Sequence, residues 1–405
     1  MAPALERLAP QPFGLMKVLL IGNYAPDAQE SMLRFAALLE GELRAAGHSV
    51  QLLQPRVRFN RASAAPEGVA KWLGYLDKFA VFPPILRRAA RRADIVHICD
   101  HSNAPYVRFL GQTPNVVTCH DVLAIRSALG LVPQNPTGAS GRVLQNFILR
   151  GLNRAQFVVC VSQNTLRQLR QISTLVPARL DVILVGFNYP YSPMPGAQAQ
   201  PRVRALLKQM DFDQPIPPYI LHVGGDQWYK NRDGVLAIYS ELRHQMGERA
   251  PHLIMAGRPF TNSMKQLIKT EKIKNVTGVS NISNEDLRAL YSLAQLFIFP
   301  SLAEGFGWPV IEAQACGARV LTSDFQPLTE VGGDAAFYAD PHDEPAFARA
   351  IAALLEQDEA AKSASVEAGF ENVARFAPQH MTDAYLQTYQ KVIDRNGKFW
   401  IKNKK

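Results

Sequence analysis

The sequence predicts an α/β protein of two doubly wound domains, each a parallel sheet covered by helices on both faces. Short continuous apolar runs alternate with amphipathic helical stretches along most of the chain. One proline-rich segment interrupts this alternation, after which it restarts. The chain has 405 residues and 47% hydrophobic composition, which is more than one hydrophobic core usually organises. We therefore expect two domains that face each other.

The first domain is expected over residues 16–195. Its strands are predicted at residues 17–22, 48–53, 94–99, 115–120, 155–162 and 179–186. An amphipathic helix is expected over Ser31 to Ala46, between the first two of them. Residues 1–15 are rich in proline and precede the first strand, so we treat them as an N-terminal extension outside the fold.

The second domain is expected over residues 218–375, after a proline-rich linker at 196–217. Its strands are predicted at residues 219–225, 252–257, 275–280, 296–301 and 318–324. Amphipathic helices follow from Glu344 to Ile393, and residues 398–405 are expected to form a mobile lysine-rich tail. We expect the C-terminal helix and basic tail, 376–405, to pack back toward the first domain.

Composition points to a cytoplasmic protein. Its four cysteines are widely spaced, as is typical of free thiols in a reducing compartment. No apolar run approaches the roughly 20 residues that span a bilayer, and the N-terminus lacks the apolar core of a secretory signal.

Positive charge is concentrated in the first half of the chain. The formal charge is +10 for residues 1–195 and −1 for the remainder. A solvated basic surface is one interpretation, and an anionic partner is the other. Four arginines near Trp72 and Phe82 suggest peripheral contact with the inner face of a membrane, or a phosphorylated lipid acceptor; they are Arg87, Arg88, Arg91 and Arg92. No aromatic-interleaved basic motif supports a nucleic-acid partner.

The most informative motif is the stretch from Pro300 to Ala313, which follows a predicted strand and leads into a helix. Gly305 and Gly307 permit a tight loop whose backbone N–H groups lie beside a helix N-terminus, where anionic oxygen is favoured. Glu304 in the loop and Glu312 in the helix offer carboxylates to different parts of one extended ligand, such as a sugar and a ribose diol.

A second motif follows the strand predicted at 219–225. Gly224 and Gly225 form a turn at the strand end, and Lys230 stands just before a helix. A lysine in that place can neutralise a diphosphate. The paired residues Asp211 and Asp213 lie before this strand, so we assign them to the linker and not to a metal site. No residue pattern calls for a metal.

These two motifs resemble the signature of the family-four retaining glycosyltransferases of the GT-B fold, also called group 1 glycosyltransferases, in which two glutamates are separated by seven residues. The resemblance implies two facing Rossmann-like domains. It also implies that Glu304, with the amides of Gly305, Phe306 and Gly307, holds the donor sugar. Glu312 would bind the ribose, and Lys230 the phosphates.

The same resemblance suggests roles for other strand-end residues. His120 would lie near the transferred sugar. Arg258 and Ser280 lie in loops that follow other predicted strands, so we expect them to edge the nucleobase. On the acceptor side we expect four residues: Asn23, Asp27, Asp121 and Ser162.

The sequence departs from the family pattern at two places. Tyr229 stands where many members carry arginine, with Arg232 as the candidate to compensate. Residues 22–29 lack the Gly-Gly pair that lines the acceptor side in many relatives.

The function implied is metal-independent transfer of a hexose from a nucleoside-diphosphate sugar, without a cofactor, to a glycan or lipid-linked acceptor in cell-surface polysaccharide or glycolipid synthesis. His120, Lys230 and Glu304 are the expected catalytic residues. The nucleotide is UDP or GDP, and the sequence does not decide between them. Two alternatives stay open: a nucleotide-sugar epimerase of similar fold and a non-catalytic nucleotide-sugar binding protein.

Overall fold

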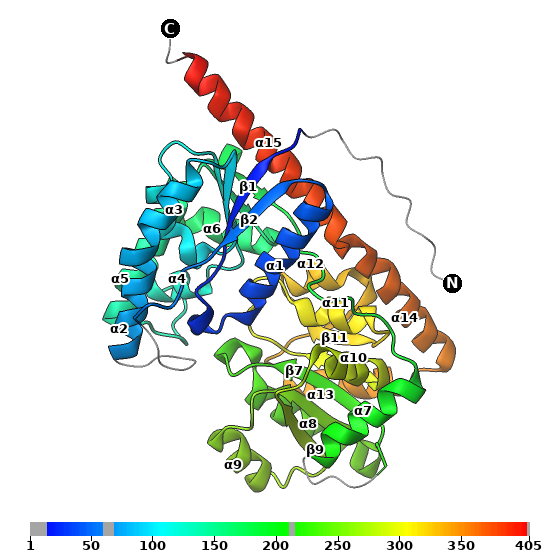
Figure 1. The fold of residues 1–405 in the computed structure, drawn as a ribbon. Helices are drawn as coiled ribbons and strands as arrows, with labels where there is room; N and C mark the ends of the chain where they lie inside the picture. Colours follow the sequence, from blue (N-terminus) through cyan, green and yellow to red (C-terminus); the bar gives the residue numbers. More distant parts are fainter. Residues whose placement is uncertain (1–13, 60–68, 210–214, 403–405) are drawn as a thin grey trace. The chain divides into compact units, whose positions relative to one another are not determined.

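The chain forms two units, each built around one parallel sheet of six strands (Figure 1). The structure is a computed structural model and describes residues 14–59, 69–209 and 215–402. The first unit comprises the chain up to Asn188 together with the segment from Pro378 onward, and the second runs from Tyr189 to Ala377. The predicted fold class of two doubly wound α/β domains is confirmed.

The sheet of the first unit has the strand order β2-β1-β3-β4-β5-β6, and all its neighbours are parallel. Its strands are β1 (Lys17–Ile21), β2 (Ser49–Leu53), β3 (Ile95–Ile98), β4 (Asn115–Cys119), β5 (Phe157–Cys160) and β6 (Leu180–Val182). Every residue of β3, β4 and β5 is buried, which explains why these segments are apolar throughout. Strand β6 is shorter than the predicted run at 179–186.

Helices connect these strands. They are α1 (Glu30–Ala45), α2 (Val69–Leu76), α3 (Phe82–Ala90), α4 (Leu123–Ala128), α5 (Ala139–Arg154) and α6 (Gln163–Ile172). η1 (Ala25–Asp27) and η4 (Pro177–Arg179) are short 3-10 turns, and η3 (His101–Phe109) is a longer 3-10 helix. A π-helical segment, η2 (Asp77–Val81), joins α2 to α3. One hydrophobic core lies between the sheet and α3, η3, α4, α5 and α6.

The C-terminal helix α15 (Pro378–Lys402) belongs to the first unit and lies beside α1 (Figure 1). A series of buried polar side chains joins α15 to the sheet. Tyr389 Oη lies 2.6 Å from His97 Nδ1 on β3, and His97 Nε2 lies 2.7 Å from Thr118 Oγ1 on β4. Thr118 Oγ1 in turn lies 2.8 Å from Tyr385 Oη. Burial, together with the nearby His120, lowers the pKa of His97 to about 3, so this ring stays neutral.

The sheet of the second unit has the order β12-β11-β10-β7-β8-β9, again with parallel neighbours. Its strands are β7 (Tyr219–Gly224), β8 (His252–Gly257), β9 (Val276–Ser280), β10 (Leu296–Phe299), β11 (Val320–Ser323) and β12 (Phe337–Ala339). Five of the six were predicted. β12 was not predicted; its three residues are all only partly buried.

The helices of the second unit are α7 (Gly196–Lys208), α8 (Arg232–Met246), α9 (Asn262–Thr270), α10 (Asn284–Leu293), α11 (Trp308–Ala315), α12 (Leu328–Gly332), α13 (Glu344–Leu355) and α14 (Glu359–Val373). Short helical turns are η5 (Trp228–Lys230), η6 (Gly247–Arg249), η7 (Gly333–Ala335) and η8 (Ala374–Phe376). A second hydrophobic core forms around α8, α13 and the middle strands.

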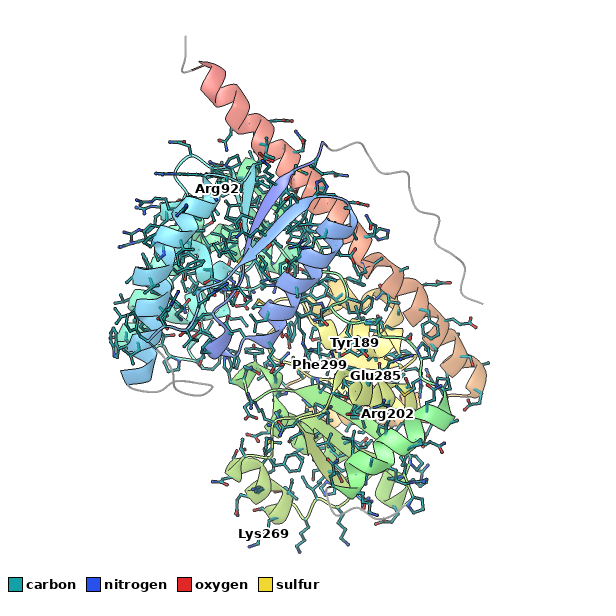
Figure 2. The ribbon with its side chains drawn as sticks, in the orientation of Figure 1. Arg92, Tyr189, Arg202, Lys269, Glu285 and Phe299 are labelled. Carbon is teal, nitrogen blue, oxygen red and sulfur yellow. The ribbon has the colours of Figure 1, made fainter. Side chains whose placement is uncertain are left out.

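The proposed linker at 196–217 needs correction, because α7 packs on α10 and buries its apolar face there. The preceding segment is also tied to α10. Tyr189 Oη donates to Glu285, and Arg288 Nε donates to Ser192 O at 2.7 Å. Figure 2 labels Tyr189, Glu285 and Arg202 close together on this side of the second unit. This segment is therefore part of the second unit, and Asp211 and Asp213 lie outside the described residues.

Three further observations concern the C-terminal tail, the cysteines and the possibility of a membrane span. The predicted mobile tail begins too early, because α15 continues through Lys402. All four cysteines are buried free thiols, as their spacing predicted. Within the described ranges, we find no helix with the length and apolarity that crossing a membrane would require.

Replacing Tyr389 with phenylalanine is expected to destabilise the first unit by about 1–3 kcal/mol, because it leaves the buried Nδ1 of His97 without its partner. Urea unfolding followed by circular dichroism measures this change. Tyr75→Phe is the control, since the half-buried Tyr75 makes ring contacts but no described hydroxyl hydrogen bond. Equal stability of the two variants would contradict the role assigned to this series of polar side chains.

Candidate active site

The carboxyl edge of the second sheet brings three strand-end residues into one row. Gly224 pairs with Gly257 across β7 and β8, and Gly257 pairs with Ser280 across β8 and β9. A Cβ atom on Gly257 would lie 2.0 Å from the carbonyl oxygen of Gly224, and its φ is +146°. Only glycine fits this close approach. Two residues predicted to bind the donor, Gly224 and Ser280, therefore share one edge.

Lys230 and Glu304 form an ion pair at this edge. Lys230 Nζ lies 2.6 Å from Glu304 Oε1, and the two side chains are 15% and 8% exposed. The ammonium group also lies 4.8 Å from the ring centroid of Phe299 and 5.5 Å from that of Tyr229, which are cation–π distances. Two of the three residues predicted to be catalytic are thus in direct contact.

Backbone contacts tie together the loops that carry this pair. Asn231 Nδ2 donates to Pro300 O at 2.9 Å, and Leu302 N donates to Tyr229 O at 2.7 Å. Asn231 adopts a left-handed conformation, with φ +53°, which asparagine tolerates better than most residues. Asn231 was not among the predicted site residues, yet its side chain joins the loop after β7 to the end of β10.

Arg232 does not take the role expected of it. Its guanidinium pairs with Asp226 and donates to Arg258 O at 2.5 Å and to Pro259 O at 3.3 Å. The residue is only 7% exposed, so its donors are used inside the protein and cannot compensate for Tyr229. The side chain of Arg258 itself is exposed.

The loop before α11 offers backbone donors but not the side chain of Phe306. Gly307 caps the helix with φ +107°, and a Cβ atom there would lie 2.7 Å from Leu328 Cδ2. Phe306 is 5% exposed, with its ring packed edge-on against Trp308 and Phe376. The side chain of Phe306 is therefore used in packing, and the predicted role of this loop's amides in holding the donor sugar stays a prediction.

Glu312 has a different neighbour from Glu304. It is 7% exposed, and its Oε2 accepts a hydrogen bond from Tyr291 Oη of α10 at 3.2 Å. Burial, with the adjacent carboxylate of Glu312, raises the pKa of Tyr291, so the phenol remains a donor. Glu304 is instead held by Lys230, so the two glutamates are fixed by separate elements.

His222 is a buried residue that the sequence reading did not select. A Cβ atom on Gly224 would lie 2.8 Å from its Nε2, and its Nδ1 lies 3.2 Å from Ile298 O. Because a carbonyl only accepts, Nδ1 carries the proton. Burial lowers the pKa of His222 to about 3. This neutral ring lies against the glycine turn. In the sequence, the signal for it was one polar residue inside an otherwise apolar strand.

The carboxyl edge of the first sheet carries a second polar cluster. Asn23 Nδ2 donates to Asp100 Oδ2 at 2.6 Å, and Asn103 Nδ2 donates to Asn23 Oδ1 at 3.1 Å. Asp100 Oδ1 lies 3.1 Å from His101 Nδ1. Burial alone would lower the pKa of His101, but the adjacent carboxylate of Asp100 outweighs it and raises that pKa to about 9. His101 is therefore cationic at neutral pH.

The sequence reading missed Asp100 and His101, although they directly follow the predicted strand at 94–99. His120, which was predicted, follows the neighbouring strand and is 6% exposed. Its Nε2 donates to Cys99 O at 2.9 Å, which leaves Nδ1 as the acceptor nitrogen of a neutral ring. Burial lowers the pKa of His120 and outweighs the nearby Asp100.

The remaining predicted acceptor-side residues have structural partners. Asp121 Oδ1 accepts from Leu123 N at 2.9 Å at the start of α4. Asp27 pairs with Lys78 at 2.8 Å. Ser162 needs correction: it is fully buried, and its hydroxyl caps α6 by accepting from Thr165 N at 3.1 Å. A solvated acceptor cannot reach that side chain without displacing the cap.

Metal ligands do not cluster in the part of the chain that the structure describes. No group of three or more His, Cys, Asp or Glu side chains is placed there to hold an ion.

Comparisons with known families cover both units. Residues 33–189 match the family described as Glycosyltransferase Family 4, and residues 209–368 match the Glycosyl transferases group 1. The chain is 24% identical over 277 residues to the O-antigen chain mannosyltransferase B of Escherichia coli, covering 68% of this chain and 70% of the relative. It is 27% identical over 365 residues to a D-inositol 3-phosphate glycosyltransferase of Mycolicibacterium paratuberculosis, covering 85% and 78%.

Solved structures share the fold. The Anabaena protein Alr3699/HepE, in complex with UDP and glucose, aligns with a TM-score of 0.67 at 18% identity, over 93% of this chain and all of that one. A sucrose-phosphate synthase from Thermosynechococcus elongatus aligns with a TM-score of 0.69 at 21% identity, over 94% of this chain and all of that one. At these identities the likeness is one of fold.

Raising the pH from 6.5 toward 9 is expected to reduce the stability of the first unit. The pKa of His101 is about 9 in the folded chain and 6.5 as its ordinary value, so its stabilisation is complete below pH 6.5 and is lost as the pH rises through about 9. The slope from this one group is at most about 1.4 kcal/mol per pH unit. Urea unfolding across this pH range measures it.

The His101→Gln variant should lack the part of the pH dependence of stability that comes from His101. His380→Gln is the matched control, because His380 is an exposed histidine of the same unit. An unchanged pH dependence in His101→Gln would show that the pair with Asp100 does not contribute.

Proposed function

The chain belongs to the group 1 glycosyltransferases of the GT-B fold, and we propose that it is a retaining, metal-independent transferase that moves a hexose from a nucleoside-diphosphate sugar to an acceptor. The observation that supports this proposal most is the contact between Lys230 and Glu304 at the carboxyl edge of the second sheet. In this contact, a cation and a carboxylate that follow two different strands lie beside backbone amides. The carboxyl edge is where a parallel sheet binds its ligand.

The roles follow from the charges that develop during transfer. When the bond to the diphosphate breaks, negative charge builds on the leaving oxygen. Lys230, the amides of residues 305–307 and the N-terminus of α11 are the groups that meet it. Glu304 positions the ammonium group before the donor binds and accepts from sugar hydroxyls afterwards. The acceptor then attacks from the leaving-group side and gives its proton to the diphosphate, so no protein nucleophile and no cofactor is required.

Nucleotide recognition is assigned to the second unit. Glu312, held by Tyr291, is the proposed acceptor for the ribose hydroxyls. Gly224, Gly225, Ser280 and the exposed Arg258 edge the base and phosphates. UDP and GDP are both retained as candidates, although HepE was solved with UDP.

The acceptor is assigned to the edge of the first unit. His120 is the proposed residue nearest the transferred sugar, with Asn23, Asp27 and Asp121 beside it. Relatives are named for O-antigen and inositol phosphate substrates. They support a glycan or lipid-linked acceptor and a role in cell-surface polysaccharide or glycolipid synthesis.

A thermal-shift screen with UDP, GDP and their hexose conjugates tests the donor assignment, since the preferred ligand stabilises the folded state. The hit is then incubated alone and with an acceptor panel, in the presence of EDTA. Transfer with retained anomeric configuration, read by NMR, is the expected result. Epimerised donor in the absence of acceptor would favour the epimerase, and binding without turnover would favour a non-catalytic protein.

Replacing Lys230 with alanine is expected to lower turnover by roughly a hundredfold or more, because one preorganised charge is removed from the leaving group. Steady-state kinetics measure this, with thermal unfolding alongside because Glu304 loses its partner. Lys230→Arg retains the charge and should keep more activity. Lys265→Ala, an exposed lysine of α9, is the control. Near-normal turnover of Lys230→Ala would reject the assignment.

We also propose a cytoplasmic location with peripheral contact at the inner face of the membrane. Three exposed apolar side chains support this, Trp72 at 69%, Leu76 at 48% and Ile85 at 47%, all on α2 and α3. Phe82 does not take part, because it lies in the core at 2% exposure.

Trp72→Ala is expected to reduce sedimentation with anionic vesicles at low salt, because an amphipathic ring is lost from the interface. Vesicles of neutral lipid serve as the comparison, and Val143→Ala, at 71% exposure on α5, is the matched control. If the wild-type protein does not sediment with anionic vesicles, the membrane contact is wrong.

A further inference from the structure

A polar cavity lies on the first unit, at the edge of the sheet opposite the one that carries His120. It has a volume of about 450 Å³ and is lined by Arg87, Arg91, Arg108 and the loop 109–113. The loop leads into β4, and the chain leaving α3 reaches the start of β1, where Asp94 N donates to Lys17 O at 2.9 Å. This is the amino edge of the sheet, away from the residues assigned to sugar transfer.

Three arginines from two separate elements meet in this cavity. Arg87 and Arg91 are four residues apart at the end of α3, so they lie on one face of that helix. Arg108 comes from the last turn of η3, and its guanidinium carbon lies 4.9 Å from the ring centroid of Phe109 and 6.0 Å from that of Phe147. Thr113 Oγ1 donates to Ala90 O at 3.3 Å and ties the loop to α3.

The arginines lack a counter-ion among the described residues. No carboxylate in those ranges lies within ion-pairing distance of Arg87, Arg91 or Arg108. Asp94, the acid nearest to α3 in sequence, accepts from Lys17 N at 2.7 Å instead.

The dipole of α3 favours cations at its C-terminus, which accounts for Arg87 and Arg91. It does not account for Arg108, which belongs to another element and adds a like charge to the same cavity. Figure 2 labels Arg92, the next basic residue after Arg91, at this end of α3. It adds further positive charge to the region.

We propose that this cavity binds a phosphate group, as a phosphomonoester or a phosphodiester. A guanidinium presents two parallel N–H donors that match phosphate oxygens, and one phosphate satisfies donors from more than one arginine. The ligand has two sources, a soluble phosphorylated metabolite or the headgroup of an anionic lipid. The site is separate from the proposed donor site, so it adds a second ligand to the protein rather than describing the first.

The test compares the full-length wild type with the double variant Arg87→Gln/Arg108→Gln, which removes one arginine from each element. Arg150→Gln/Arg170→Gln is the control, since both residues are exposed arginines of the same unit and the change in net charge is equal. Arg108→Lys keeps the charge but loses the paired donors. Calorimetric titration with glycerol 1-phosphate probes the soluble source, and sedimentation with vesicles of phosphatidylcholine with or without phosphatidylglycerol probes the lipid source.

We expect the double variant to bind the recognised probe at least about tenfold more weakly than wild type and control, with Arg108→Lys between them. Loss in the glycerol 1-phosphate titration identifies a soluble ligand. Loss with phosphatidylglycerol vesicles alone identifies a lipid headgroup.

Equal behaviour of the double variant and the control with both probes overturns the proposal, as does absence of binding to either probe by the wild type. Phosphate that binds in the second unit affects all the proteins alike and cancels in the comparison. Sugar transfer is measured on the same samples, and its absence in the wild-type protein would show a failure of the proposed enzymatic function separately from the loss of phosphate binding.

Discussion

The candidate site depends on one mostly buried ion pair, that of Lys230 with Glu304. Withdrawing two charges from water is costly, and a pair of this kind seldom adds net stability over apolar residues of the same volume. We therefore assign the pair a role in positioning Lys230 rather than in stabilising the fold. The carboxylate holds the ammonium group over the ring of Phe299, and the hydrogen bond from Asn231 to Pro300 O keeps the two loops in register. An anionic ligand that enters this edge meets a cation whose place is already set.

Each unit places a cation paired with a carboxylate near a neutral histidine at the carboxyl edge of its sheet. In the second unit a lysine is neutralised by a glutamate, with a neutral histidine, His222, beneath the neighbouring glycine turn. In the first unit a histidine is made cationic by Asp100, while the adjacent His120 stays neutral. Each result depends on which buried neighbour lies closest, since burial alone would favour the uncharged form of all three histidines.

The sequence predicted the fold well and the site in part. Continuous apolar runs mark buried parallel strands, so most strands and the candidate edges were located, whereas the short and only partly buried β12 was not. Position after a strand selected Lys230 and Glu304, which the structure brings into contact. It does not reveal side-chain partners: Ser162 caps a helix and Arg232 is held by Asp226 and two carbonyls, both through contacts made only once the chain is folded. His101 was missed because its charge comes from the adjacent carboxylate of Asp100, which outweighs burial and which periodicity does not encode.

The return of α15 to the first unit has a consequence for synthesis on the ribosome. Because Tyr385 and Tyr389 follow the whole second unit in the chain, the first unit emerges without the hydroxyl groups that complete the chain through His97 and Thr118. The sheet of the first unit lacks the hydroxyl partner of the His97 ring until translation has added some two hundred further residues. The second unit can finish folding first, although it starts later, and a nascent chain arrested before α15 would present an incomplete N-terminal half to chaperones.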